Sequence, residues 1–265
     1  MDIERIVNLL LPFLASDADQ LRAREIAPNI STYIDILLRW NARMNLTAIR
    51  DPEEIVTRHF GESLFAARHL FPGVVDVGSA AAGCPAEQSS AVVLHNSSAR
   101  SGDRGRATLQ DPVKAAKERA SAPAVADLGS GAGFPGLPTK LWAPDISLTL
   151  IESNQKKSIF LREITRALTL TDINIQNARA ESLPQASFDV VTLRAVERFD
   201  TILPTAAALV APNGRLALLI GTAQLTKAEY ALPNFELDQP RTIPESASRV
   251  LLVGIKGSPA KNQDS

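Results

Sequence analysis

A glycine-rich segment at residues 127–133 constrains the fold of this chain more than any other feature. It reads Asp-Leu-Gly-Ser-Gly-Ala-Gly and lies between an apolar run and a helical pattern. Closely spaced glycines in that context let the backbone turn sharply and approach a nucleotide-like ligand. The loop that binds dinucleotides has the spacing G-x-G-x-x-G/A, and here the position that must be small is Phe134. The spacing therefore disfavours a nicotinamide-dependent oxidoreductase, a class that composition alone leaves open.

The chain from Val125 onward alternates strand patterns with helix patterns, which indicates a parallel sheet covered by helices on both faces. Gly129, Gly131 and Gly133 have the spacing G-x-G-x-G, which is typical of S-adenosylmethionine-dependent methyltransferases. We therefore expect an α/β fold: a Rossmann-like class I S-adenosylmethionine-dependent methyltransferase sheet with an N-terminal helical region. Its strands are expected at residues 125–128, 146–151, 173–176, 189–193, 216–220 and 249–255, with a turn at 212–214 before the fifth.

An acidic residue, Glu152, ends the second expected strand. Because the carboxyl ends of parallel strands lie at one edge of the sheet, its carboxylate is expected beside the glycine loop. A carboxylate at that place can accept hydrogen bonds from the two ribose hydroxyls of a cofactor. Gly129, Gly131, Gly133 and Glu152 are accordingly predicted to bind the cofactor.

Residues 1–72 are predicted to form the N-terminal helical region. One helix face is defined by apolar residues at helical spacing: Ile30, Tyr33, Ile34 and Leu37. A second helix has a clear start, since Asp51 can cap it and Pro52 has the backbone angle of a first turn. The buried stripe of this second helix is expected at Val56, Phe60, Leu64 and Ala67.

Residues 73–124 differ from the rest of the chain in composition. Ala, Ser and Gly supply 24 of these 52 residues, and the segment has no aromatic residue and no isoleucine. Because it has so little to bury, we expect a poorly ordered insertion before a methyltransferase domain at 125–256, with a flexible tail at 257–265.

The start of this segment, residues 74–85, looks like a degraded copy of residues 125–135. Ala80 replaces the middle glycine there, so the second copy is interpreted as the working loop. The insertion precedes the first strand, at the edge of the sheet opposite the cofactor. Deleting residues 74–122 is therefore expected to preserve cofactor binding.

Composition limits the classes of partner. The formal net charge is −1, so any RNA contact must use a local patch. One cysteine, Cys84, excludes an internal disulfide and a multi-cysteine zinc site, and three scattered histidines suggest no metal site. The N-terminus lacks the pattern of a signal peptide, and no apolar stretch approaches the roughly 20 residues of a membrane span. We expect a cytoplasmic protein with no metal and no membrane partner.

Further motifs accompany the glycine loop. In the helical region they are Arg39-Trp40-Asn41, Met44-Asn45-Leu46-Thr47, Asp51-Pro52 and Arg58-His59-Phe60. After the insertion they are residues 127–138, Leu150-Ile151-Glu152-Ser153 with Lys156-Lys157 and Phe160-Leu161, Arg179-Ala180-Glu181, and Leu193-Arg194-Ala195. Over about residues 20–72 and 125–256 the chain resembles the GidB/RsmG family of guanine-N7 methyltransferases of small-subunit ribosomal RNA. It departs from that family at Glu62, where the family typically has aspartate.

The resemblance implies a cofactor, S-adenosyl-L-methionine, and five residues that contact it: Gly129, Phe134, Ala180, Glu181 and Arg194. Phe134 would offer an apolar wall, and Ala180 with Glu181 would lie where an adenine edge is read. Arg194 would hold either the methionine carboxylate or an RNA phosphate.

The implied reaction is methyl transfer to N7 of a guanine in the decoding region of 16S rRNA, with 16S rRNA or the small ribosomal subunit as partner. Guanine N7 carries a lone pair and no proton, so the reaction needs no general base, and no catalytic residue is assigned. Asn41, Asn45 and Arg58 are candidate substrate contacts, whereas Trp40 and His59 are interpreted as packed residues.

A row of cations, Lys156, Lys157, Arg162 and Arg166, is interpreted as a solvated helix face rather than a phosphate contact. Two further hypotheses stay open at this point. One is a methyltransferase of the same fold that acts on a protein or small molecule. The other is a non-catalytic, ribosome-binding descendant disabled by the insertion.

Overall fold

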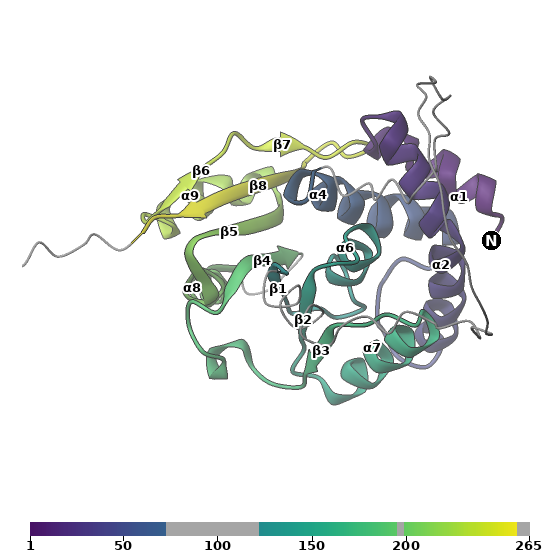
Figure 1. Ribbon diagram of the computed structural model, residues 1–265, viewed down its shortest axis with the longest axis horizontal. Coiled ribbons are helices and arrows are strands. Elements are labelled where there is room, and N and C mark those ends of the chain that lie inside the picture. Colours follow the sequence, from purple (N-terminus) through teal and green to yellow (C-terminus); the bar gives the residue numbers. More distant parts are fainter. Residues whose placement is uncertain (73–121, 195–198, 259–265) are drawn as a thin grey trace, which may run out of the picture. The chain divides into compact units, whose positions relative to one another are not determined.

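Parallel strands form the centre of the structure. The computed structural model describes residues 1–72, 122–194 and 199–258. The parallel strands are β1 (Ala124–Leu128), β2 (Ser147–Ile151), β3 (Ile173–Gln176), β4 (Phe188–Arg194) and β5 (Val210–Gly221). They pair in the order β3-β2-β1-β4-β5 (Figure 1). The order reverses between β1 and β4, which is the Rossmann-like arrangement, so the expected fold class is confirmed and a crevice for ligands is expected at their carboxyl ends.

An antiparallel segment completes the sheet beyond β5. It contains β6 (Phe235–Leu237), β7 (Arg241–Thr242) and β8 (Arg249–Lys256), and β8 pairs with all three of β5, β6 and β7. The expected turn at 212–214 lies within β5, where Asn213 has a φ of 63°. The strand starts earlier than predicted because Val210 pairs with Phe188 before the register shifts.

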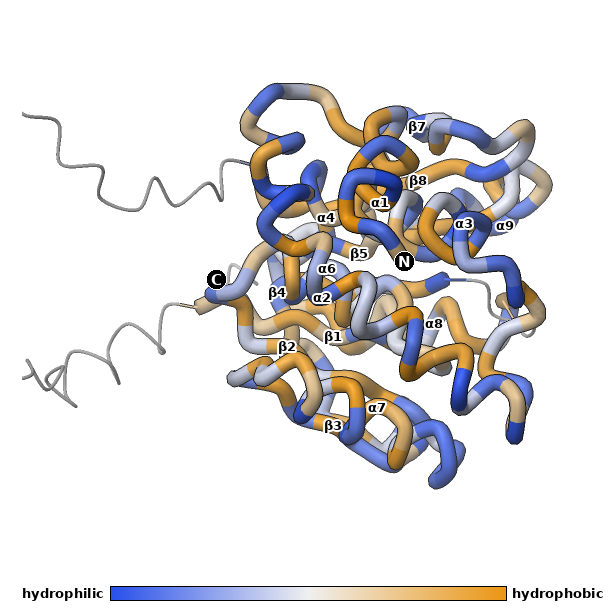
Figure 2. Tube along the Cα trace, turned by 90° about the vertical axis from the view of Figure 1, so that its right-hand side faces the viewer, coloured by the Kyte–Doolittle hydropathy of each residue, from blue (hydrophilic) through white to orange (hydrophobic). Residues whose placement is uncertain are grey.

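Alternating side chains of the strands build two cores, one on each face of the sheet. Val125 belongs to the first core and Ala126 to the second, and the other strands alternate in the same way. The first core lies under α2 (Asp17–Asn41), α4 (Glu62–Leu70), α6 (Gly136–Trp142) and α7 (Gln155–Ala167), and the second under α8 (Phe199–Leu209) and α9 (Leu225–Ala231). Figure 2 shows apolar and hydrophilic residues alternating along α7, as expected of a helix with one covered face.

The helical region before the sheet starts with α1 (Ile3–Leu10), α2 and α3 (Pro52–Glu54). Asp51 caps α3 as predicted, since its Oδ1 accepts the Glu54 N–H at 2.8 Å. The predicted stripe at Val56, Phe60, Leu64 and Ala67 is fully buried. Its first part is a π-helical segment, η2 (Ile55–Gly61), which a period of 3.6 residues does not predict.

Short 3-10 turns complete the described elements: η1 (Leu11–Phe13), η3 (Ala180–Ser182) and η4 (Thr222–Gln224). The described residues of the helical region and of the sheet belong to one compact unit. The predicted insertion at 73–124, the degraded copy at 74–85 and the predicted tail at 257–265 lie wholly or mostly outside the described residues.

Candidate functional site

The glycine loop leaves the carboxyl end of β1 and leads into α6. All three of its glycines have positive φ: 69° at Gly129, 55° at Gly131 and 88° at Gly133. Among the described residues, a Cβ on Gly129 would meet nothing within 4 Å, and one on Gly131 would meet only a backbone oxygen at 3.7 Å. This side of the loop is therefore open, which suits the close approach of a ligand to the backbone.

A buried acid anchors the loop to its neighbours. Asp127, the fourth residue of β1, accepts the Thr192 hydroxyl at 2.9 Å on Oδ1 and the Gly136 N–H at 3.2 Å on Oδ2. Burial raises the pKa of this carboxyl to about 6, although these hydrogen bonds lower it. Asp127 thus ties β1 to β4 and to the start of α6, a role that the sequence alone did not reveal.

Glu152 lies directly after β2 and faces the same loop. Its Oε2 accepts the Gly131 N–H at 2.9 Å, and its Oε1 accepts the Asn154 N–H at 2.7 Å. Each carboxylate oxygen has a second lone pair, so both can still accept a hydroxyl. The structure therefore places Glu152 beside Gly131, where the predicted ribose contact requires it.

The back of the glycine loop packs against α2. The Tyr33 hydroxyl, fully buried, donates to the Ala132 carbonyl at 2.6 Å, and a Cβ on Gly133 would collide with that hydroxyl. The Phe134 ring stacks on Tyr33 at 5.4 Å and on His59 at 4.7 Å between centroids. Phe134 is only 6% exposed, so its ring supports the loop from within the core. The sequence placed Tyr33 on a buried helix face but gave no sign of this contact.

Arg194, the last residue of β4, points toward the helical region. Its guanidinium donates to the Arg58 carbonyl at 2.6 Å, to Glu62 at 3.0 Å and to the Nδ1 of His59 at 3.1 Å. Glu62 is 1% exposed and also pairs with the side chains of Arg58 and Arg249. The predicted contact of Arg194 with a cofactor carboxylate would have to use guanidinium N–H groups that donate to none of these three residues. Nothing in the sequence pointed to Arg249 as a member.

His59 is held in its neutral form by this network. Its pKa is lowered from 6.5 to about 3. Burial is the largest cause, and the positive charges of Arg194, Arg58 and Arg249 contribute the rest. Because Nδ1 accepts from Arg194, we assign the ring proton to Nε2, which lies 2.7 Å from the Thr47 hydroxyl. The interpretation of His59 as a packed residue is confirmed.

Ala180 and Glu181 lie in η3, between β3 and β4. Ala180 is 5% exposed and belongs to the same core as Leu128 and Ile151, the last residues of β1 and β2. Glu181 is exposed. The turn therefore lies at the carboxyl edge of the sheet, where the prediction needs it.

The three candidate substrate residues lie in different environments. Asn41 is 3% exposed, and its side chain accepts the N–H groups of Leu46 and Thr47 and donates to the Thr47 carbonyl. Its amide therefore closes the 41–47 loop, which does not fit the expectation of direct substrate contact. Asn45 is exposed and the Arg58 side chain is 40% exposed, so both remain accessible.

Trp40 packs against the core as predicted, edge-on to Phe160 at 5.7 Å. Among residues 1–72, 122–194 and 199–258, no group of three or more His, Cys, Asp or Glu side chains is placed to hold a metal ion. Within the same ranges, every helix is too short or too polar to traverse a bilayer.

Comparison with known proteins gives a consistent result. Residues 26–88 and 106–247 match the family model GidB, described as rRNA small subunit methyltransferase G. The ribosomal RNA small subunit methyltransferase G of Halorhodospira halophila is 34% identical over 79% of this chain and 78% of its own length. The protein of that name from Xylella fastidiosa strain 9a5c is 28% identical over 84% of each chain. A SAM-dependent methyltransferase structure from Aquifex aeolicus covers 55% of this chain and 89% of its own, at 15% identity and a TM-score of 0.44. The chain belongs to the GidB family of rRNA small subunit methyltransferases.

Proposed function

We propose that this chain transfers a methyl group from S-adenosyl-L-methionine to N7 of a guanine in the decoding region of 16S rRNA, in the cytoplasm. The observation that carries the proposal is an open glycine loop beside an anchored carboxylate, in a chain of the GidB family. The family makes the chain an S-adenosylmethionine-dependent rRNA methyltransferase, as the sequence predicted. The target atom, the position in the rRNA and the cellular compartment are our proposals beyond what the family shows.

The residues at the carboxyl edge of the sheet fit the cofactor. The open backbone at Gly129 and Gly131 suits its close approach, and the free lone pairs of Glu152 suit its ribose hydroxyls. We assign the adenine edge to the turn at Ala180 and Glu181. The ring of Phe134 holds the loop in shape rather than forming an exposed wall.

The reaction needs orientation more than acid–base chemistry. Gly129, Gly131 and Glu152 would hold S-adenosylmethionine there, and its sulfonium would supply an electrophilic methyl group to the N7 lone pair. Because N7 carries no proton, none of the side chains has to act as a base. Positioning of the two reactants can lower such a barrier by roughly 7–11 kcal/mol. The chain supplies this positioning through the loop that Tyr33, Asp127 and Glu152 hold in place.

The target guanine must be unpaired or displaced from its helix. N7 lies on the Hoogsteen edge, which the deep, narrow major groove of A-form RNA hides from side chains. We propose Asn45 and Arg58 of the helical region at 1–72 as contacts to this RNA, and the domain at 125–256 as the cofactor domain. The partner is 16S rRNA, presented as free rRNA or within the small ribosomal subunit.

A labelling experiment tests the proposal. Purified protein is incubated with methyl-labelled S-adenosylmethionine and small subunits from a strain that lacks this modification, and the labelled base is mapped. Label at one guanine N7 in the decoding region is the expected result, with large subunits as the unlabelled control.

Two other outcomes contradict the proposal in different ways. Cofactor binding without label on rRNA points to a methyltransferase with a protein or small-molecule substrate. Subunit binding with no gain in thermal stability from S-adenosylmethionine points to a non-catalytic, ribosome-binding descendant.

A further inference from the structure

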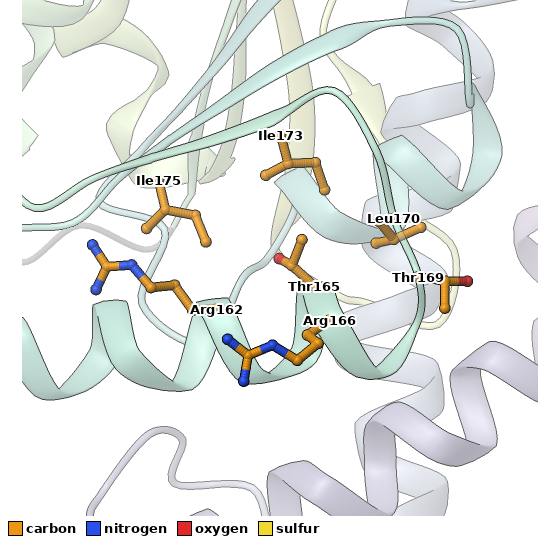
Figure 3. Close-up of a pocket in the computed structure, with 7 residues that line it drawn as sticks. All are labelled: Arg162, Thr165, Arg166, Thr169, Leu170, Ile173 and Ile175. Atoms are coloured by element: carbon orange, nitrogen blue, oxygen red, sulfur yellow. The ribbon is translucent and has the colours of Figure 1, made fainter.

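A groove at the outer edge of the sheet lies outside the site described above. It has a volume of about 540 Å³ and runs between α7 and β3 (Figure 3). Its lining residues are Arg162, Thr165, Arg166, Thr169, Leu170, Ile173 and Ile175. β3 is the end strand of the sheet, so α7 covers its apolar side chains incompletely, and Ile173 and Ile175 remain half-buried.

The charge of the groove comes from two arginines one turn apart on α7. Arg162 and Arg166 are both exposed, and Figure 3 shows their guanidinium groups extending to the same side of the helix. Among the described residues neither forms an ion pair, and Glu163, which lies between them, pairs with neither. By contrast, the exposed arginines Arg24 and Arg241 each have a carboxylate partner. The groove thus presents two uncompensated guanidinium groups beside an apolar floor.

This combination fits a single strand of nucleic acid. Guanidinium groups bind phosphate oxygens in a fork geometry, and their planes stack on unpaired bases. The aliphatic floor offers contact to a ribose or a base, and Ile159, one turn before Arg162, adds an apolar side chain that is 46% exposed. An acidic peptide could pair with both arginines, but it has no ribose or base to pack against the apolar floor. The groove therefore favours RNA.

The position of the groove relative to the glycine loop supports the same partner. α7 begins three residues after Glu152, and its axis leads from the cofactor edge toward the groove. At a rise of about 1.5 Å per residue, Arg162 and Arg166 lie about 10 and 16 Å along the helix from its first residue. An RNA strand whose target base enters at the glycine loop can therefore continue along α7.

We infer that the groove between α7 and β3 binds the sugar-phosphate backbone of the rRNA substrate a few nucleotides from the methylated guanine. This inference rests on the proposed function and adds a second contact area to it. It changes the interpretation of Arg162 and Arg166 from a solvated helix face to a phosphate-binding pair.

The test compares two double variants that remove the same charge. Arg162→Gln with Arg166→Gln alters the groove. Arg24→Gln with Arg241→Gln is the control, because it removes two positive charges outside the groove. Binding to protein-free 16S rRNA and to small subunits is measured over a series of KCl concentrations, separately from methyl transfer. Loss of two single-strand phosphate contacts lowers the salt slope by about 1.4, which weakens binding about 25-fold at about 0.1 M KCl if the contacts contribute nothing at about 1 M. Thermal unfolding and the affinity for S-adenosylmethionine are expected to stay unchanged.

The outcomes separate this inference from the proposed function. If the groove variant binds with the affinity and salt slope of the unaltered protein, the inference is overturned. An equal loss of affinity in the groove variant and the control also overturns it, because that result reports only net charge. A loss confined to assembled subunits points to a ribosomal protein as the partner and also overturns it. Groove-dependent rRNA binding by a protein that transfers no methyl group upholds the inference while the proposed function fails. Absence of any rRNA binding by the unaltered protein contradicts both.

Discussion

The neutral form of His59 makes the stability of this protein depend on pH in a way that one substitution isolates. The pKa of the ring falls from 6.5 in the unfolded chain to about 3 in the folded one, because it is buried and faces Arg194, Arg58 and Arg249. Below about pH 6.5 the unfolded chain therefore takes up a proton that the folded chain refuses. The stabilisation is present above pH 6.5 and is lost as the pH falls toward 3.

The magnitude follows from the two pKa values of His59. Between about pH 7.5 and pH 5, this residue alone lowers the free energy of unfolding by about 2 kcal/mol. Asp127 acts in the opposite direction, since its folded pKa of about 6 exceeds its ordinary 3.8 and adds about 1.4 kcal/mol over the same fall in pH. These two effects partly offset each other. His69, whose pKa is also lowered by burial, adds to the loss of stability as the pH falls below 6.5.

The substitution His59→Gln removes one side of this balance. The variant loses stability at every pH, because ring stacking on Phe134 and the hydrogen bonds to Thr47 and Arg194 are lost or altered. The diagnostic quantity is the difference in the free energy of unfolding between variant and unaltered protein. That difference should shrink by about 2 kcal/mol from about pH 7.5 to pH 5.

Urea unfolding at constant ionic strength, followed by tryptophan fluorescence and far-UV circular dichroism, measures this difference directly. Fixed ionic strength matters because three guanidinium groups surround the ring. If the difference between the two proteins is the same at pH 5 and pH 7.5, the ring is not held neutral, and the reasoning about the network is refuted.

Three further predictions concern the loop and the helical region. Tyr33→Phe leaves a buried loop carbonyl without its donor, so unfolding should become about 1–3 kcal/mol easier in urea, and calorimetry should show weaker S-adenosylmethionine binding. Gly133→Ala places a Cβ against the Tyr33 hydroxyl and should prevent stable folding. Gly129→Ala faces open space, so that variant should fold at a cost of about 1–2 kcal/mol but lose cofactor binding. Equal circular dichroism spectra of the two variants would contradict this contrast. Asn41→Ala removes three hydrogen bonds and should destabilise by about 2–3 kcal/mol, whereas Asn45→Ala should leave the urea midpoint unchanged and raise only KM for the RNA substrate.

The sequence predicted the parts of the fold that local pattern controls. The strands at the centre of the sheet were found because buried parallel strands are continuous apolar runs, and the glycine loop because its backbone requires positive φ at three positions. β6 and β7 were missed, since strands of three and two residues are too short to show a period. The π-helical turn at 55–61 was missed because it keeps its buried stripe while changing the backbone hydrogen bonds.

The surroundings of two candidate site residues, Asn41 and Arg194, depend on contacts that the sequence pattern does not show. Asn41 stands in a polar motif, which made it a candidate for substrate contact. In the structure its amide instead forms hydrogen bonds with Leu46 and Thr47 of its own loop. Arg194 was placed correctly at the end of β4, but the direction of its side chain depends on Glu62, which lies far earlier in the sequence. Spacing along one strand or helix cannot reveal such pairings.

The helical region contacts the glycine loop and the end of β4 directly. Tyr33 of α2 holds the glycine loop through the Ala132 carbonyl, and His59 of η2 stacks on Phe134 at the end of the same loop. Glu62, the first residue of α4, fixes the guanidinium of Arg194 at the end of β4. These three contacts join the helices to two different strands of the sheet, so movement of the helices must alter the loop and Arg194 together. Under the proposed function, RNA bound to the exposed side of the helices would act on the elements that shape the glycine loop and orient Arg194. Substrate binding would then change the affinity for the cofactor.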